Sequence, residues 1–219
     1  MPSALIFDLD GTLVDSVYAH VVAWQRALAE FGVETDAARI HKRIGMSGAL
    51  LMQEAVQEAG VTLGPRRREA AEARHDVLYR RLNPRPKPTT GALDLLRTLR
   101  DRRIIYGIAT SGRQNTIQTA LQALKIDKDV VVVDGGGKAR AKPEPDLFLA
   151  CAERLATAPA QCFVIGDAVW DVLAARRAGI QAVGLTCGGY AEQELYQAGA
   201  LRVYRDPLML MSNLGQLGI

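Results

Sequence analysis

Hydrophobic residues recur at helical spacing over most of the first 82 positions of the chain and then switch to short runs of strand length. One exception opens the sequence, because the apolar run at 4–6 predicts a buried strand. The spacing that follows predicts a helix ended by Gly32, with an apolar stripe made of Val17, Val21, Trp24, Leu28 and Phe31. Further helices are predicted at 47–59 and 65–82, and the proline-rich stretch 83–88 indicates an extended connector.

Beyond this connector, strand-like and helix-like stretches alternate. The expected strands are 104–109, 130–133, 162–165 and 182–185, and the expected helices are 92–99, 116–124, 145–155 and 172–178. Such alternation is typical of a parallel sheet with helices on both faces, so the predicted fold class is α/β with a doubly wound core. The earlier helical stretch interrupts this core. We therefore predict an α/β core formed by residues 1–14 and 87–219, and an inserted all-helical domain formed by residues 15–86.

Composition narrows the class of protein. Of the 219 residues, 48% are hydrophobic, which is enough for a sizeable core, and the net charge is only +3. The arginine clusters lack interleaved aromatic residues, so we expect solvated surfaces and no nucleic-acid partner. The three cysteines are widely spaced and odd in number, which is typical of a reducing compartment. No apolar stretch is long enough for export or membrane spanning, and we expect a cytoplasmic monomer or weak dimer with no membrane partner.

Two carboxylates follow the first predicted strand. Asp8 and Asp10 lie two positions apart, so in an extended backbone their side chains point the same way, and Gly11 provides the turn that ends the strand. Carboxylates that converge at a strand end are costly to bury unless a cation or a shared proton relieves them. Mg²⁺ prefers such oxygen ligands and needs few of them from the protein. An isolated Asp-x-Asp-Gly is commonly a plain strand and turn, so the interpretation depends on the later segments.

Polar groups also follow or precede the later elements of the predicted core. They are Thr110-Ser111-Gly112 after the strand at 104–109, Gly166-Asp167 with Asp171 after the strand at 162–165, and Lys142 ahead of the helix at 145–155. Taken singly, each is typical of a turn, a helix cap or a solvated lysine. In open parallel sheets, however, ligands bind beyond the carboxyl ends of the strands, so these groups are expected to meet. Their recurrence favours one shared site.

Four of these segments resemble, in order and spacing, the motifs of the haloacid dehalogenase superfamily, which consists mainly of phosphatases. The four segments are 7–16, 108–111, 141–146 and 164–171, and the resemblance extends over residues 4–187. The helical insertion resembles the cap domain of the branch that includes phosphoglycolate phosphatases and β-phosphoglucomutases. The resemblance therefore implies a Rossmann-like core with an inserted helical cap.

The resemblance also implies a role for each motif residue. Asp8 would attack phosphorus and form an aspartyl-phosphate, and Asp10 would protonate the leaving oxygen and later take a proton from water. The groups that hold the phosphoryl oxygens would be Thr110, Ser111, Gly112 and Lys142. The Mg²⁺ ligands would be Asp8, the Asp10 carbonyl, Asp167 and, directly or indirectly, Asp171. Dehalogenases and phosphonatases of the superfamily replace the second acid, so Asp10 favours phosphoryl transfer.

In the cap, the candidate substrate-facing residues are His20, Ser47 and Arg74. His20 lies at the edge of the apolar stripe, where it either packs in the core or approaches the active site, as a similar histidine does in the mutases. Gly48 stands where the mutases carry an arginine that anchors a second phosphate. Arg43, Arg74 or His75 would have to replace that arginine.

We therefore expect a Mg²⁺-dependent phosphatase that hydrolyses a small phosphorylated metabolite, either a sugar phosphate or phosphoglycolate. One alternative is a mutase similar to β-phosphoglucomutase, which returns the phosphoryl group to a substrate hydroxyl and not to water. The other is a non-catalytic regulatory or binding module of the same fold. The intact set of Asp8, Asp10, Thr110, Lys142 and Asp167 argues against that module, because decayed sites usually lose such groups.

Overall fold

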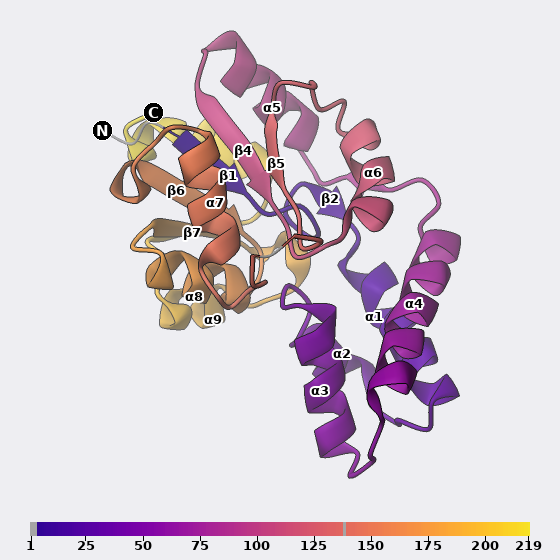
Figure 1. Cartoon of the computed structure of the whole chain (residues 1–219). Helices are drawn as coiled ribbons and strands as arrows, with labels where there is room; N and C mark the ends of the chain where they lie inside the picture. The colour runs from indigo at the N-terminus through magenta and orange to yellow at the C-terminus, as the bar shows by residue number, and fades with distance from the viewer. Residues whose placement is uncertain (1–3, 138) are drawn as a thin grey trace.

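The centre of the molecule is a six-stranded sheet in which every neighbouring pair of strands runs parallel, in the order β5-β4-β1-β6-β7-β8 (Figure 1). It is seen in a computed structural model that describes residues 4–137 and 139–219, so the first three residues of the predicted core lie outside it. The strands are β1 (Ala4–Phe7), β4 (Ile105–Ala109), β5 (Val131–Val133), β6 (Cys162–Gly166), β7 (Gln181–Leu185) and β8 (Arg202–Tyr204). The predicted α/β class with a doubly wound core is confirmed.

Strand β1 lies inside the sheet and is buried on both faces, because successive side chains point to opposite sides. Leu5 and Phe7 join one hydrophobic cluster, which is covered by α5 (Ala92–Asp101), α6 (Gln114–Ala123) and α10 (Pro207–Ser212). Ala4 and Ile6 join the other, which is covered by α7 (Asp146–Arg154), α8 (Val169–Arg177) and α9 (Glu192–Ala198). With helices on both faces, the carboxyl ends of the strands are where polar side chains can share a space.

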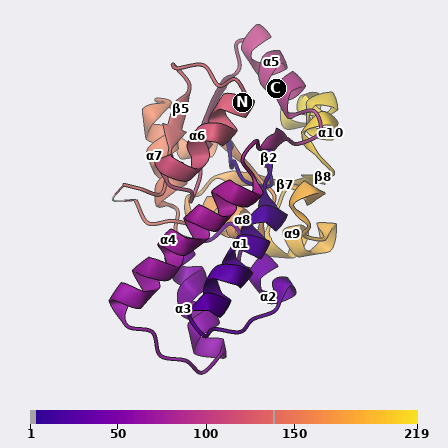
Figure 2. The same cartoon turned by 90° about the vertical axis from the view of Figure 1, so that its right-hand side faces the viewer.

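The chain leaves and re-enters this core through a short antiparallel pair, β2 (Val14–Asp15) with β3 (Lys87–Pro88). Between them lie α1 (Val17–Glu30), α2 (Ala37–His41), α3 (Gly48–Glu58) and α4 (Pro65–Leu82). Helices α1 and α4 lie side by side, and the helical part projects from one edge of the core (Figures 1 and 2). The apolar stripe predicted on α1 is buried against α2 and α3 in a separate hydrophobic cluster, with only Phe31 at its margin.

Most predicted elements agree with the structure to within one or two residues, but helix α2 (Ala37–His41) was not predicted, and two further regions differ. Helix α8 begins at Val169 and not at 172, because the Asp171 carboxylate accepts a hydrogen bond from the Ala168 N–H at 3.0 Å and stabilises the first turn. No elements were predicted after residue 185, where the structure has β8, α9 and α10. Three short 3₁₀ helices complete the described elements, at Pro159–Gln161, Thr186–Gly188 and Leu214–Leu217.

Within residues 4–137 and 139–219, no helix is both long enough and apolar enough to cross a membrane.

Candidate active site

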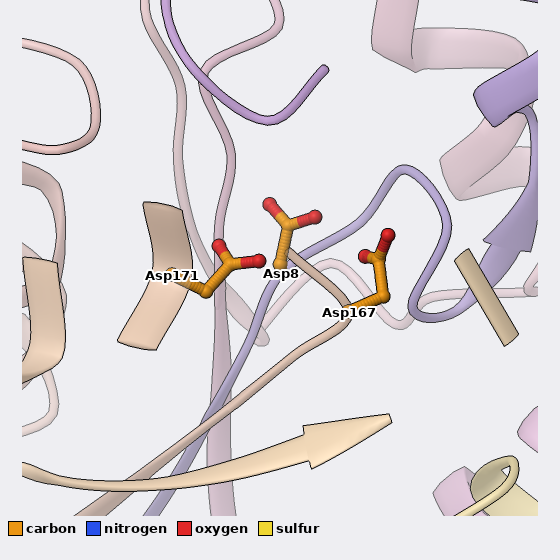
Figure 3. Close-up of side chains that lie close together, drawn as sticks. All are labelled: Asp8, Asp167 and Asp171. Atoms are coloured by element: carbon orange, nitrogen blue, oxygen red, sulfur yellow. The ribbon is translucent and has the colours of Figure 1, made fainter. Parts of the chain in front are cut away.

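Three carboxylates from two strand ends converge at the carboxyl edge of the sheet (Figure 3). Asp8 directly follows β1, Asp167 directly follows β6, and Asp171 lies in the first turn of α8. One oxygen from each side chain lies within 4.8 Å of the other two, and all three residues are buried. The Asp8 N–H donates to the Ile165 carbonyl at 2.8 Å, which holds the end of β1 beside β6. The sheet therefore assembles the acidic cluster that the sequence motifs predicted.

A fully buried lysine lies among these carboxylates. The Lys142 ammonium donates to an Asp8 oxygen and lies 2.7 Å from Asp171 Oδ1. Burial opposes the charge on Lys142, but the Asp171 and Asp8 carboxylates outweigh it and raise the lysine pKa. Asp171 Oδ2 accepts a hydrogen bond from the Ala168 N–H, whereas the buried Oδ1 forms an ion pair with Lys142 and has no hydrogen-bond partner. Asp171 thus holds Lys142 in place beside Asp8.

The three buried carboxylates outnumber the one ammonium. Burial raises the pKa of Asp8 to about 7, with Asp171 adding to the effect and Lys142 opposing it. Burial and the neighbouring carboxylates also raise the pKa of Asp167 well above its usual value. A divalent cation would relieve this excess of negative charge, and a set of hard oxygen donors fits Mg²⁺.

The Asp167 carboxylate is confined on several sides. Thr12 Oγ1 donates to its Oδ1 at 2.7 Å. Gly11 and Gly188 pack so closely around it that a Cβ at either position would collide with an Asp167 oxygen. At Gly11 the positive φ of +86° gives a second reason for glycine. These contacts fix the carboxylate orientation and fit a metal ligand.

Asp10 lies at the boundary between core and cap, where a chain of polar side chains reaches it. Ser16 Oγ donates to Asp10 Oδ1 at 2.6 Å, and His20 Nε2 lies 3.3 Å from the same oxygen. Burial raises the Asp10 pKa, but His20 and Ser16 outweigh burial and lower it. His20 Nδ1 is in turn 3.1 Å from His75 Nε2, and His75 Nδ1 is 3.1 Å from Asp76 Oδ1.

Stacking holds the two imidazole rings in this chain. The His20 ring stacks on Tyr79 with centroids 3.8 Å apart, and the His75 ring stacks on Trp24 at 4.2 Å. Of the two arrangements left open for His20, the structure shows the one in which it approaches the active site.

The segment after β4 lines the cavity and contacts the cap. Thr110 is buried, and its Oγ1 accepts a hydrogen bond from the Gly112 N–H at 3.0 Å. Ser111 Oγ donates to the Gly45 carbonyl of the cap at 3.1 Å. The cap is also held by Trp170 Nε1 and the Tyr190 hydroxyl, which donate to the Lys42 carbonyl at 3.0 and 2.7 Å. The cap therefore lies closed over the strand ends.

Core and cap enclose a cavity of about 110 Å³. The core lines it with Asp8, Asp10, Thr110, Ser111, Gly112, Arg113 and Thr116. The cap lines it with His20, Trp24, Arg43, Ile44, Gly45, Met46, Gly48, Leu51, Glu72, His75 and Asp76. The structure therefore brings the predicted catalytic aspartates, the phosphate-binding segment and His20 into one space, with Lys142 directly behind Asp8.

Two predicted cap residues do not line this cavity. Arg74 forms two hydrogen bonds of 2.7 Å with Glu30 on α1, at the outer surface of the cap. Ser47 caps α3, and its Oγ accepts from the Leu50 N–H at 3.2 Å. The prediction that either faces the substrate does not match their positions. The neighbouring residue His75 points inward because adjacent helical positions are about 100° apart.

The sequence reasoning missed several cavity residues. Trp24 was predicted as part of the apolar stripe, and Glu72 and Asp76 were not predicted as site residues. The available signal was the spacing of Glu72, His75, Asp76 and Tyr79, which places them on one face of α4.

The comparisons with known proteins agree with this geometry. The family model for haloacid dehalogenase-like hydrolases matches residues 2–179. A solved hydrolase from Pseudomonas syringae is 43% identical, with a TM-score of 0.95, and the match covers 98% of this chain and 99% of that one.

Curated relatives carry more specific names. A fructose-1-phosphate phosphatase of Escherichia coli is 33% identical over 83% of this chain and 95% of its own length. A phosphoglycolate phosphatase of Rhodospirillum rubrum is 31% identical, over 98% and 92%. A β-phosphoglucomutase of Bacillus subtilis is 30% identical, over 84% of both. The resemblance noted in the sequence is thereby confirmed, and this chain belongs to the family of haloacid dehalogenase-like hydrolases.

Proposed function

We propose that the protein is a Mg²⁺-dependent phosphatase that hydrolyses a small phosphorylated metabolite through an aspartyl-phosphate intermediate. The observation that carries this proposal is the position of Asp8, which lines the cavity together with Asp10 and accepts a hydrogen bond from the buried Lys142 ammonium. A carboxylate beside an ammonium and a second carboxyl group suits nucleophilic attack on a phosphoryl group. The phosphatase names of two curated relatives support the same reaction class.

In the first step, an Asp8 oxygen attacks phosphorus and the bond between phosphorus and the ester oxygen breaks. The ester oxygen leaves with the bonding electron pair and takes a proton from the Asp10 carboxyl group, so an alcohol is released. Thr110 and the neighbouring backbone N–H groups hold phosphoryl oxygens, while Lys142 offsets negative charge at Asp8. In the second step, the water oxygen bonds to phosphorus while Asp10 accepts a proton from that water, the bond between phosphorus and the Asp8 oxygen breaks, and phosphate and the Asp8 carboxylate are released.

The Asp8 and Asp167 carboxylates, with the Asp10 carbonyl, would hold Mg²⁺. Asp171 would act through Lys142, with which its Oδ1 forms an ion pair, or as a further ligand through that same oxygen, which has no hydrogen-bond partner. When bound, the ion neutralises the charge that otherwise repels an anionic nucleophile from an anionic ester.

The mutase alternative requires a second anion site in the cap. Gly48 stands at the position of the arginine that the mutases carry, and the Trp24 ring occupies the space beside it, since a Cβ on Gly48 would lie 3.0 Å from Trp24 Cζ2. The three candidate replacements do not supply a free cation. Arg43 donates to Glu54, Glu58 and the Arg39 carbonyl, Arg74 is paired with Glu30, and His75 is hydrogen-bonded to His20 and Asp76. Transfer to water is therefore favoured.

The test is phosphate release from a panel of small phosphate esters, measured with Mg²⁺ and again with excess EDTA. We expect Mg²⁺-dependent turnover that Asp8→Asn abolishes, together with a phosphorylated Asp8 peptide after acid quench. Asp10→Asn should still take phosphate from p-nitrophenyl phosphate in a burst and then release it slowly. Turnover by Asp8→Asn within about tenfold of the wild type would exclude the covalent mechanism.

Incubation with β-glucose 1-phosphate and a trace of the 1,6-bisphosphate separates the hydrolase from the mutase. We expect free phosphate to exceed glucose 6-phosphate. The reverse result would establish the mutase.

A further inference from the structure

The wall of the cavity that faces Asp8 from the cap has a charge pattern of its own. Helix α4 lines it with Glu72, His75 and Asp76, and Arg113 lines it from the start of α6. The Glu72 side chain is 16% exposed and that of Asp76 is 19% exposed, so both carboxylates lie where a bound substrate would remove their remaining water.

The cations of this wall are already paired. Arg113 donates to Glu72 at 2.7 Å. The Arg43 guanidinium forms three hydrogen bonds within the cap. Its Nε donates to Glu54 at 2.7 Å, one terminal nitrogen donates to Glu58, and the other terminal nitrogen donates to the Arg39 carbonyl at 3.0 Å. Among the described residues that line the cavity, both arginines, Arg43 of the cap and Arg113 of the core, have a carboxylate partner.

The remaining charge of the wall is negative. Burial raises the pKa of Asp76, but its contacts with His75 and Arg113 outweigh burial and lower it, so this carboxyl group is ionised. Burial lowers the pKa of His75 to about 4, so this imidazole is neutral near pH 7. Carboxylates and neutral imidazoles both accept hydrogen bonds from substrate hydroxyl groups. A second anionic group on the substrate would be repelled by the carboxylates and would not be neutralised by the imidazole.

We propose that this wall, formed by Glu72, His75, Asp76 and Arg113, selects esters whose alcohol part is short, uncharged and rich in hydroxyl groups. Esters whose alcohol carries a carboxylate or a second phosphate are disfavoured, because their extra anion would be desolvated beside Glu72 and Asp76. The inference rests on the proposed phosphatase function, and it chooses between the two substrate classes that the motifs leave open. The cavity volume of about 110 Å³, below the 300–1,000 Å³ usual for larger ligands, favours probes of about three carbons.

Glycerol 3-phosphate and 3-phosphoglycerate form a matched pair, because they differ only in a hydroxymethyl group against a carboxylate at the far carbon. The experiment measures kcat/KM for both esters in the presence of Mg²⁺. We expect a preference for glycerol 3-phosphate of at least about tenfold. Glu72→Gln and Asp76→Asn should each narrow this ratio by raising kcat/KM for 3-phosphoglycerate about three- to tenfold. Glu69→Gln, which removes an exposed carboxylate from the same helix, is the control and should leave the ratio as in the wild type.

p-Nitrophenyl phosphate separates failure of this inference from failure of the proposed function. Its leaving group needs neither a proton nor hydroxyl contacts, so its turnover reports on phosphoryl transfer to and from Asp8 without hydroxyl contacts at the cap. If p-nitrophenyl phosphate is turned over in an Asp8-dependent way, equal or faster hydrolysis of 3-phosphoglycerate overturns the inference and leaves the phosphatase standing. Turnover of neither three-carbon ester above the Asp8→Asn background likewise overturns it. If p-nitrophenyl phosphate is not turned over either, the proposed function itself fails.

Discussion

The two walls of the cavity are built differently. On the core wall Asp8 lines the cavity at the end of a strand, with Lys142 and Asp171 beside it outside the lining, and the three side chains are 0–5% exposed. The cap wall places its charged groups on α4 and on the segment before α3, where they pair with partners that range up to 57% exposed. The core wall therefore concentrates charged groups where they are shielded from solvent. The charged groups of the cap wall form ion pairs with partly exposed partners.

This difference separates chemistry from selection. Charges in a buried, low-dielectric site act strongly on a reacting group and are costly to leave unpaired. Charges at a partly hydrated wall act weakly on the reaction and change which ligand is tolerated. Substitutions in the core wall should therefore lower turnover of every ester, whereas substitutions in the cap wall should change the ranking of esters.

The largest effect is expected for Asp8→Asn. The amide is neither a nucleophile nor a good ligand for a divalent cation, so kcat should fall by more than about a thousandfold for alkyl and aryl esters alike. Steady-state phosphate release measures the loss, and far-UV circular dichroism checks that the fold is retained. A loss that differs greatly between esters would contradict the separation between the two walls.

The next largest effect is expected for Lys142→Met. The change leaves Asp8 and Asp171 without their buried cation, which should lower the free energy of unfolding by about 3–5 kcal/mol and kcat by at least about a hundredfold. Urea unfolding in EDTA measures the first quantity. Arg74→Met is the matched control in the cap, because it removes an exposed pair with Glu30 and should leave the urea midpoint nearly unchanged. Equal losses for the two variants would contradict the contrast.

The same contrast explains how far the sequence alone could lead. Asp8, Thr110 and Asp167 each follow an apolar run directly, so local pattern and the geometry of parallel strands were enough to place them together. The alternation of strands and helices likewise predicted the sheet, except near β8, where the chain offers only the short run Arg202–Tyr204. The prediction of the core wall therefore needed little knowledge of packing between distant segments.

The cap wall depends on such packing. Arg74 and His75 are neighbours in sequence but lie in different surroundings because of the rotation of α4 against α1. On α1, Glu30 accepts a hydrogen bond from Arg74, and His20 is hydrogen-bonded to His75. Periodicity indicated one mixed, arginine-rich helix and did not show which face it would bury. Ser47 was similarly placed near the site but is used to cap α3. Helix rotation is a tertiary outcome that a short motif does not encode, whereas the Ser47 cap is a local hydrogen bond that the serine ahead of a helical stretch could have predicted.

A smaller effect should appear in the pH dependence of stability. The pKa of His75 is about 4 in the folded protein, whereas its ordinary value is 6.5. Between these two pH values the imidazole is protonated in the unfolded chain and neutral in the folded protein. Its contribution is thus fully present above pH 6.5 and is lost as pH falls toward 4, by up to about 3 kcal/mol. In metal-free protein, the contribution of Asp8 to stability has the opposite pH dependence. Its pKa is raised to about 7, so the folded state binds a proton at pH values where the unfolded chain does not, and this contribution is lost as pH rises through 7.

Urea unfolding of the wild type and of His75→Phe between pH 4 and pH 7.5, in EDTA, isolates the histidine. Phenylalanine keeps a ring for stacking on Trp24 and does not titrate. The wild type should lose stability relative to the variant as pH falls. A difference between the two proteins that is constant across this range would show that His75 does not change its protonation on unfolding.

The smallest effect is expected for Gly48→Ala. The new Cβ would lie 3.0 and 3.4 Å from two atoms of the Trp24 ring, so the ring must shift by a few tenths of an ångström, which changes the shape of the cavity that Trp24 lines. Because the ring contacts the substrate side of the cavity and not the reacting atoms, KM for glycerol 3-phosphate should rise about threefold while kcat stays within about twofold.

Gly64→Ala is the matched control for this change, since Gly64 also lies at the start of a cap helix but a Cβ there meets no atom within 4 Å. Both variants lose the freedom of a glycine in the unfolded chain, so a general effect on the cap would appear in both. Only crowding of Trp24 distinguishes them. A similar rise in KM for Gly64→Ala would mean that cap stability, and not the shape of the wall, determines binding. A fall in kcat of tenfold or more for Gly48→Ala would mean that this part of the cap wall reaches the chemistry of Asp8 and Asp10.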